Sequence, residues 1–88
     1  MKDVVFSGAC ERDLRKLVKR GKDLSKLYAV VECLAKGEAL AAKHTPHLLK
    51  GYWKPHWDCH IEPDWILIYQ VTEDVIKLAR TGTHSDLF

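Results

Sequence analysis

The sequence predicts a single α+β domain in which an N-terminal strand and a helical hairpin precede an antiparallel meander of three or four strands. Two observations predict this order. Apolar residues recur with a helical period as far as residue 37, and from residue 57 they alternate with a strand period. With 88 residues, 47% hydrophobic and 30% charged, the chain has the composition of one globular domain, so residues 1–88 are assigned to one domain.

The N-terminal half carries the strand and both helices. Residues 4–6 (Val-Val-Phe) form a short apolar run typical of a strand, and Ser7 or Gly8 can end it and cap a helix. That helix is expected to end near Gly21, with a core face of Cys10, Leu14, Leu17 and Val18. Asp23 is a candidate cap for a second helix that ends near Gly37, with an apolar face of Leu24, Leu27, Tyr28, Val31 and Leu34.

The C-terminal half predicts the meander. Residues 38–46 are expected to form a loop with at most one helical turn. Beyond it, Trp57, Cys59 and Ile61 alternate with polar residues, which is typical of a half-buried strand. Pro63 and Asp64 mark a tight turn into a nearly continuous apolar run over residues 65–71, and a last strand is expected over residues 75–81.

Composition excludes several classes of protein. No apolar stretch approaches the ~20 residues of a membrane span, and the N-terminus lacks the apolar region of a signal peptide, so the expected location is cytoplasmic. The three cysteines form no C-x-x-C pair and are expected to be reduced, with Cys10 and Cys33 buried on helix faces. No phosphate-binding glycine loop and no G-x-S-x-G nucleophile turn occurs, so no cofactor is expected.

Positive charge is concentrated on the first predicted helix. Half of the 14 lysines and arginines lie between residues 12 and 26. Four of them recur with helical period on a face separate from the apolar one: Arg12, Arg15, Lys16 and Lys19. Such a face is either simply solvated or a binding surface for polyanionic RNA, and we predict RNA binding.

All five histidines lie after residue 43. An antiparallel meander can bring His60, in a strand, close to Arg80 and to His84 after the last strand. One chemistry for such a cluster is metal binding through His56-x-x-Cys59-His60. The spacing disfavours it, because adjacent residues of a strand point to opposite faces and no second Cys/His pair follows. The other is RNA cleavage without metal, for which two imidazoles supply base and acid and a guanidinium holds the phosphate.

Four segments resemble the YafQ branch of the RelE/ParE toxins, which are messenger-RNA endonucleases of toxin-antitoxin pairs. They are His47-Leu-Leu-Lys-Gly-Tyr-Trp53, His60-Ile-Glu-Pro-Asp-Trp-Ile-Leu-Ile-Tyr69, Arg80-Thr-Gly-Thr-His84 and Leu87-Phe88. The resemblance implies a RelE-like microbial ribonuclease fold and a toxin that cleaves message on the ribosome, without metal, through 2′-hydroxyl attack. It implies as partners the ribosome, messenger RNA and a cognate DinJ/RelB-like antitoxin, in a hetero-oligomer.

The resemblance also implies site residues: His47, His60, Asp64, Trp65, Arg80, His84 and Phe88. Within it, His84 is expected to be the general acid, His60 or His47 the base, Arg80 the phosphate clamp and Phe88 a stacking platform. Asp64 is expected to orient a histidine or bind a nucleotide hydroxyl, and Trp65 to contact RNA or to be structural. Alternatives remain: Arg80 in an ordinary salt bridge with Asp64 or Asp86, and His44 and His56 at the surface. The alternative function is a ParE-like toxin or binding module that acts on a protein without cleaving RNA.

Overall fold

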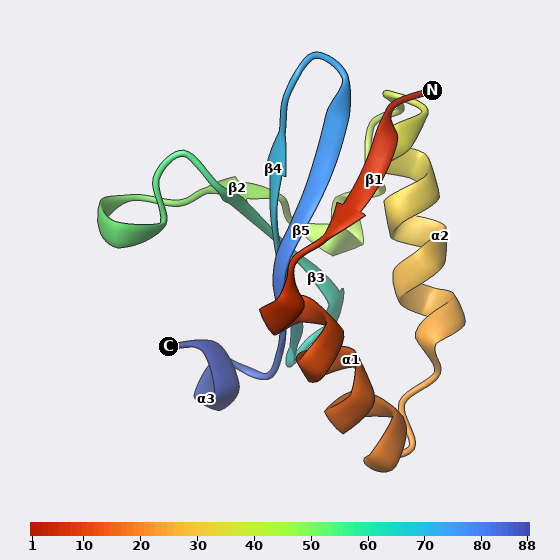
Figure 1. The fold of residues 1–88 in the computed structure, drawn as a ribbon, viewed down its shortest axis with the longest axis vertical. Coiled ribbons are helices and arrows are strands. Elements are labelled where there is room, and N and C mark those ends of the chain that lie inside the picture. Colours follow the sequence, from red (N-terminus) through yellow and green to blue (C-terminus); the bar gives the residue numbers. More distant parts are fainter.

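The computed structural model describes residues 1–88 and confirms the α+β order (Figure 1). Strand β1 spans Asp3–Phe6, helix α1 Gly8–Lys19 and helix α2 Leu24–Ala35. A 3₁₀ turn η1 (Ala42–His44) precedes the two-residue strand β2 (His47–Leu48), and a second 3₁₀ turn η2 covers Gly51–Trp53. The meander follows as β3 (Trp57–Glu62), β4 (Trp65–Val71) and β5 (Val75–Gly82), and the chain ends in a short helix α3 (His84–Leu87) that was not predicted from the sequence.

The five strands form one sheet in the order β1-β5-β4-β3-β2. β2 to β5 are antiparallel neighbours, whereas β1 pairs parallel with β5. Helices α1 and α2 cover one face of this sheet (Figure 1) and bury the main core against it. From the sheet this core takes alternate residues, including Cys59 and Ile61 of β3 and Leu67 and Tyr69 of β4, as the period of two predicts.

Both predicted helix caps are confirmed. The Ser7 hydroxyl accepts a hydrogen bond from the Cys10 amide, and the Asp23 carboxylate accepts one from the Ser25 amide. The predicted apolar faces are partly wrong. Val18 is 57% exposed and Tyr28 is 47% exposed, while the helix positions that are buried but were not predicted are Asp13, Val30 and Ala35. Each helix is therefore rotated relative to its predicted core face.

The second face of the sheet carries a smaller apolar cluster. Its buried members are Ile66, Ile68 and Ala79, and the partly buried side chains of Leu49, Trp53 and Leu87 pack against them. This outer face is covered by the segment after β2 and by α3 rather than by α1 and α2. Asp58 and His60 of β3 project from this face, because they pair with Ile68 and Ile66 of β4 and alternate with core residues.

Burial of the cysteines follows the prediction only in part. Cys10 and Cys59 are fully buried, and burial raises the pKa of each thiol to about 12, so neither is a nucleophile near neutral pH. Cys33 was predicted to be buried but is only half-buried, and its thiol contacts backbone carbonyls of the following loop. No helix of the protein has the length and apolar character needed to cross a membrane.

Candidate active site on the outer face of the sheet

Strand register places the predicted site residues on the outer face. One cross-strand row runs His47–Asp58–Ile68–Arg80, and the next runs His60–Ile66–Gly82. Since residues two apart on a strand share a face, β2, β3 and β5 contribute to one surface. His84 follows Gly82 by two residues, at the start of α3. The meander thus brings together residues 37 positions apart in sequence, counting from His47 to His84.

His60 and His84 face each other across this surface. Their ring centroids are 5.6 Å apart and the ring planes meet at 70°. Both residues are accessible to solvent: the His84 side chain is 56% exposed, and His60 is half-buried. Two imidazoles at this separation can reach different oxygens of one phosphodiester, which is the arrangement that paired acid and base catalysis requires.

Asp64 fixes the orientation of His84. Its Oδ1 accepts hydrogen bonds from the His84 ring Nδ1, at 2.7 Å, and from the His84 amide, at 3.1 Å. The side-chain bond from His84, followed by the amide bond, lowers the pKa of Asp64 below its ordinary value of 3.8, so this carboxyl is ionised at neutral pH. With Nδ1 held by Asp64, Nε2 of His84 is the nitrogen left to face a substrate.

Arg80 has a partner that was not predicted from the sequence. Its Nε and Nη2 donate to the two carboxylate oxygens of Asp13, at 2.6 and 3.0 Å, and this pair raises the pKa of Arg80. Asp13 lies on α1 with its side chain 7% exposed, and it also accepts from the Thr81 amide. The proposed pairings of Arg80 with Asp64 or Asp86 are wrong: Asp86 instead binds Arg20. Because Asp13 holds Nε and Nη2, Nη1 is the least engaged part of the Arg80 guanidinium.

His47 lies at the β2 end of the surface. Its Nδ1 is 3.7 Å from Oδ1 of Asp58, and its side chain is 67% exposed. Since His47 pairs with Asp58, it is diagonal to His60, and diagonal neighbours of antiparallel strands lie about 7–8 Å apart. His47 therefore borders the His60–His84 pair without touching it.

The two aromatic residues predicted to contact RNA differ in their exposure to solvent. Trp65 is 1% exposed, and its indole N–H donates to the Thr81 hydroxyl inside the core. The prediction that Trp65 contacts RNA is therefore wrong, and its role is structural. Phe88 is 63% exposed, with its ring centroid 6.5 Å from that of His84, so it borders the same surface.

His44 and His56 are not simple surface residues, contrary to the prediction. Both are half-buried. His44 Nδ1 lies 2.6 Å from the His60 carbonyl oxygen, and His56 Nδ1 lies 2.9 Å from the Trp53 carbonyl oxygen. The His44 contact spans 16 positions and is set by tertiary structure, whereas the His56 contact is local, to a carbonyl three residues earlier.

The predicted basic face lies beside the site. Its four side chains on α1 are exposed: Arg12, Arg15, Lys16 and Lys19. A small polar cleft of about 40 Å³ next to it is lined by Lys16, Arg20 and Arg80 together with Asp13 and Asp86. Three cations against two carboxylates leave this cleft with a formal charge of +1. The basic face of α1 therefore continues towards Arg80 rather than facing away from the site.

Comparison with known proteins identifies the fold and the family. Residues 2–88 match the model of a family described as bacterial toxins of type II toxin-antitoxin systems, YafQ. The chain belongs to the YafQ family of toxins. It is 41% identical over 88 residues to the mRNA interferase toxin YafQ of Escherichia coli K12, covering 99% of this chain and 96% of that protein.

Solved structures of YafQ-like toxins have the same fold. The E. coli DinJ-YafQ toxin-antitoxin complex contains a chain that matches with a TM-score of 0.91 and 41% identity, covering 99% of this chain and 97% of that one. A metal-bound toxin from Helicobacter pylori matches with a TM-score of 0.94 and 43% identity over 100% of both chains. The fold derived from the strand, hairpin and meander pattern is thus the fold of these toxins.

The metal in that H. pylori structure raises the question of a metal site in this YafQ-family chain. No group of three or more histidine, cysteine, aspartate or glutamate side chains is arranged here to hold a metal ion. Cys59, which the sequence places next to His60, points into the core instead. The side chains as arranged do not fit a metal ion.

Gly82 allows α3 to pack closely onto the end of β5. A Cβ at this position would lie 2.8 Å from Oδ2 of Asp86, at a backbone angle φ of +158°. Asp86 cannot easily yield, because it also binds Arg20 and the Thr83 amide. We expect Gly82→Ala to displace α3 with His84, and a shift of about 1 Å at a catalytic group can cost about 100-fold in rate. Cleavage assays together with thermal unfolding measure this.

Gly37→Ala is the matched control for that substitution. Gly37 also has a positive φ, +73°, but nothing lies within 4 Å of its Cβ position. It should lose stability through backbone strain, of order 1–3 kcal/mol, and keep its cleavage rate at temperatures where it is folded. Equal rates for the Gly82 and Gly37 variants would show that α3 tolerates the added methyl group.

Proposed function

We propose that this protein is the toxin of a type II toxin-antitoxin system and inhibits translation by cleaving messenger RNA. The observation that carries the proposal is the His60–His84 pair, 5.6 Å between ring centroids, with Asp64 bound to His84. The name of the E. coli relative, mRNA interferase toxin, supports the same activity. A ParE-like toxin that acts on a protein does not require two facing imidazoles with a carboxylate bound to one of them.

The cleavage step follows from the arrangement of the two rings. His60, or His47 beside it, removes the proton of a ribose 2′-hydroxyl, and the 2′-oxygen attacks the adjacent phosphorus. The bond from phosphorus to the 5′-oxygen breaks, and His84 donates a proton from Nε2 to that leaving oxygen. The products are a 2′,3′-cyclic phosphate and a 5′-hydroxyl. Each proton transfer of this kind contributes about 10²–10⁴-fold to the rate.

Asp64 and Arg80 stabilise the charges that develop on the His84 imidazole and on the phosphate during this step. Asp64 stabilises the protonated imidazole of His84 before it donates and keeps Nδ1 from turning towards the substrate. Arg80 stays charged, and its free N–H groups can bind a non-bridging phosphate oxygen while Asp13 holds the opposite edge. Phe88 offers an exposed ring on which a neighbouring base can stack, a contact worth about 1–3 kcal/mol.

We propose the ribosome as the place of cleavage and a small antitoxin as the partner that restrains it. The basic face of α1, Arg12, Arg15, Lys16 and Lys19, is suited to phosphates of ribosomal RNA. The E. coli relative forms a complex with DinJ, which supports a DinJ/RelB-like antitoxin for this chain, one per toxin within a larger hetero-oligomer. We place this complex in the cytoplasm, where message is translated.

The test is to incubate purified protein with ribosomes and a defined message, and in parallel with the same free RNA. We expect cuts that leave 5′-hydroxyl ends on ribosome-bound message, unchanged by a zinc-selective chelator that leaves Mg²⁺ in solution. We expect no cuts when the antitoxin encoded beside the toxin is added. Intact message in every arm would refute the nuclease. Loss of cleavage with that chelator, restored by zinc, would refute the metal-free step.

Charge reversal on α1 tests the ribosome contact. We expect Arg15→Glu with Lys19→Glu to weaken ribosome binding and to flatten its salt dependence, because the slope of log K against log salt falls by about one unit for each phosphate that the protein no longer binds. Binding is measured by sedimentation over a range of salt concentrations. Lys77→Glu is the matched control for Arg15→Glu alone, since both change the net charge by two units, and Lys77 is exposed on β5 outside the basic face. An equal weakening in the control would mean that net charge alone is sensed.

A further inference from the structure

His44 hydrogen-bonds to the edge of strand β3 beside the catalytic surface. Its Nδ1 lies 2.6 Å from the carbonyl oxygen of His60. A carbonyl oxygen can only accept a hydrogen bond, so Nδ1 of His44 carries a proton and donates it. Among all side chains, His44 is the one that hydrogen-bonds to the backbone of β3.

The backbone of β3 around His60 has few other hydrogen bonds to hold it. β2 pairs only with Trp57 and Asp58. From Cys59 to Glu62, no strand therefore pairs with the edge of β3 opposite β4. The pairing of β3 with β4 also shifts register between His60 and Glu62. A strand that is unpaired on one side and irregular on the other has few bonds to hold its backbone, and His60 lies within that stretch.

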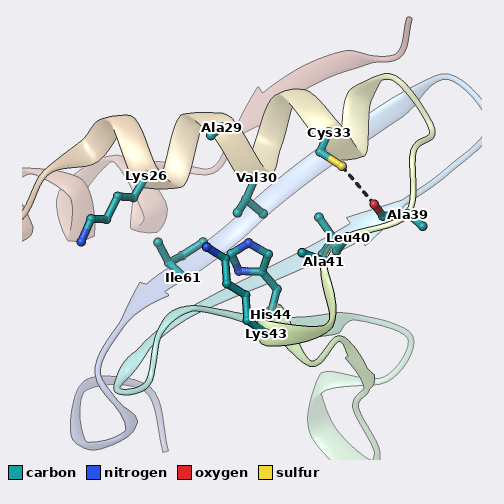
Figure 2. Close-up of a pocket in the computed structure, with 10 residues that line it drawn as sticks. All are labelled: Lys26, Ala29, Val30, Cys33, Ala39, Leu40, Ala41, Lys43, His44 and Ile61. Carbon is teal, nitrogen blue, oxygen red and sulfur yellow. Dashed lines mark hydrogen bonds between the residues drawn. The ribbon is translucent and has the colours of Figure 1, made fainter.

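The ring of His44 is itself held in place. Figure 2 shows it rising from the η1 turn towards Val30 of α2 and Ile61 of β3. These side chains and Leu40 line the same pocket, about 550 Å³, between α2 and the loop that precedes β2. Since one side of the imidazole is enclosed by apolar groups, its N–H stays directed at the His60 carbonyl.

We propose that His44 is a positioning residue, which fixes the backbone of His60 and so keeps the His60 imidazole opposite His84. This inference rests on the proposed function of the His60–His84 pair. His44 touches no reacting atom, and its effect passes through the carbonyl of His60. Loss of the bond frees the β3 edge, and a displacement of about 1 Å between acid and base is enough to cost about 100-fold in rate.

Two substitutions separate the hydrogen bond from the volume of the ring. His44→Asn keeps an N–H donor close to the position of Nδ1, whereas His44→Phe keeps an aromatic ring in the pocket without a donor. On ribosome-bound message we expect His44→Phe to lower kcat by about 10- to 100-fold with little change in KM, and His44→Asn to recover most of the loss. His44→Leu is a second donor-free variant, to be used if the phenyl ring prevents folding.

Nuclear magnetic resonance of the His60 ring gives a readout that does not depend on activity. The ring resonances of His60 should shift in His44→Phe and stay close to wild type in His44→Asn. Leu40→Ala is the matched control, because it removes a side chain from the same pocket and leaves the bond to His60 intact. This control should lower the melting temperature without changing kcat or the His60 resonances.

The outcomes distinguish the two proposals. If wild type does not cleave message, the proposed function fails, while the His60 resonances still test whether His44 holds that residue. Wild-type kcat in His44→Phe overturns the positioning role. Equal losses of kcat in His44→Asn, His44→Phe and Leu40→Ala, in step with their melting temperatures, also overturn it, because packing alone would then explain the effect.

Discussion

Replacing His84 with alanine should lower the rate of message cleavage by about 10²–10⁴-fold and leave the fold unchanged. The rate falls because the leaving 5′-oxygen loses its proton donor. The fold survives because the side chain is 56% exposed and its main partner, Asp64, is at the surface. Cleavage of ribosome-bound message by single-turnover kinetics measures the first effect, and thermal unfolding measures the second.

Two comparisons make that result specific. Ser85→Ala changes the next, exposed residue of α3 and should keep full activity, which controls for disturbance of the short helix. Asp64→Asn should lose activity less severely, because it weakens the orientation of His84 without removing the ring. In the double variant the two losses should not add, since Asp64 acts only through His84. Near-normal cleavage by His84→Ala would remove His84 as the acid.

Local chemistry explains which parts of the fold could be predicted from the sequence. Ser7 and Asp23 bind amides within three residues along the chain, so their capping roles are visible without tertiary structure. The alternation in β3 is equally local. Short turns connect the meander strands, so the convergence of His60 and His84 could be expected from strand order. Helix α3 could also have been found, because Thr83 and Asp86 form a capping box three residues apart.

The remaining features depend on contacts between distant segments. Asp13 binds Arg80 from 67 positions away, and its charge argues against burial although it lies three residues after Cys10 and four before Leu17. The same limit explains the misplaced apolar faces, since Val30 is buried by the sheet while Tyr28, two residues earlier, is exposed. The sequence left the role of Trp65 open between RNA contact and structure, because its bond to Thr81, which joins β4 to β5 inside the fold, is set by tertiary structure.

The buried pair of Asp13 and Arg80 leads to the second large prediction. Asp13→Asn should reduce the free energy of unfolding by about 3 kcal/mol, the lower end of the range for breaking a buried ion pair, because Arg80 remains 29% exposed. The carboxylate accepts from Nε, from Nη2 and from the Thr81 amide, and an amide cannot replace both of its oxygens as acceptors. Urea unfolding at 25 °C, where the slope reports the exposed surface, measures the loss.

Asp13→Asn should also slow cleavage under conditions where it is folded, because Asp13 is what holds Arg80 at the end of β5 beside the catalytic surface. Glu11→Gln is the matched control: Glu11 lies on the same helix, is exposed and has no ion-pair partner, so both stability and rate should stay near wild type. A change in unfolding free energy below about 0.5 kcal/mol would place Asp13 with ordinary surface residues. Full activity in a clearly destabilised Asp13→Asn would instead show that Arg80 finds the phosphate without this carboxylate, and that the pair serves the fold alone.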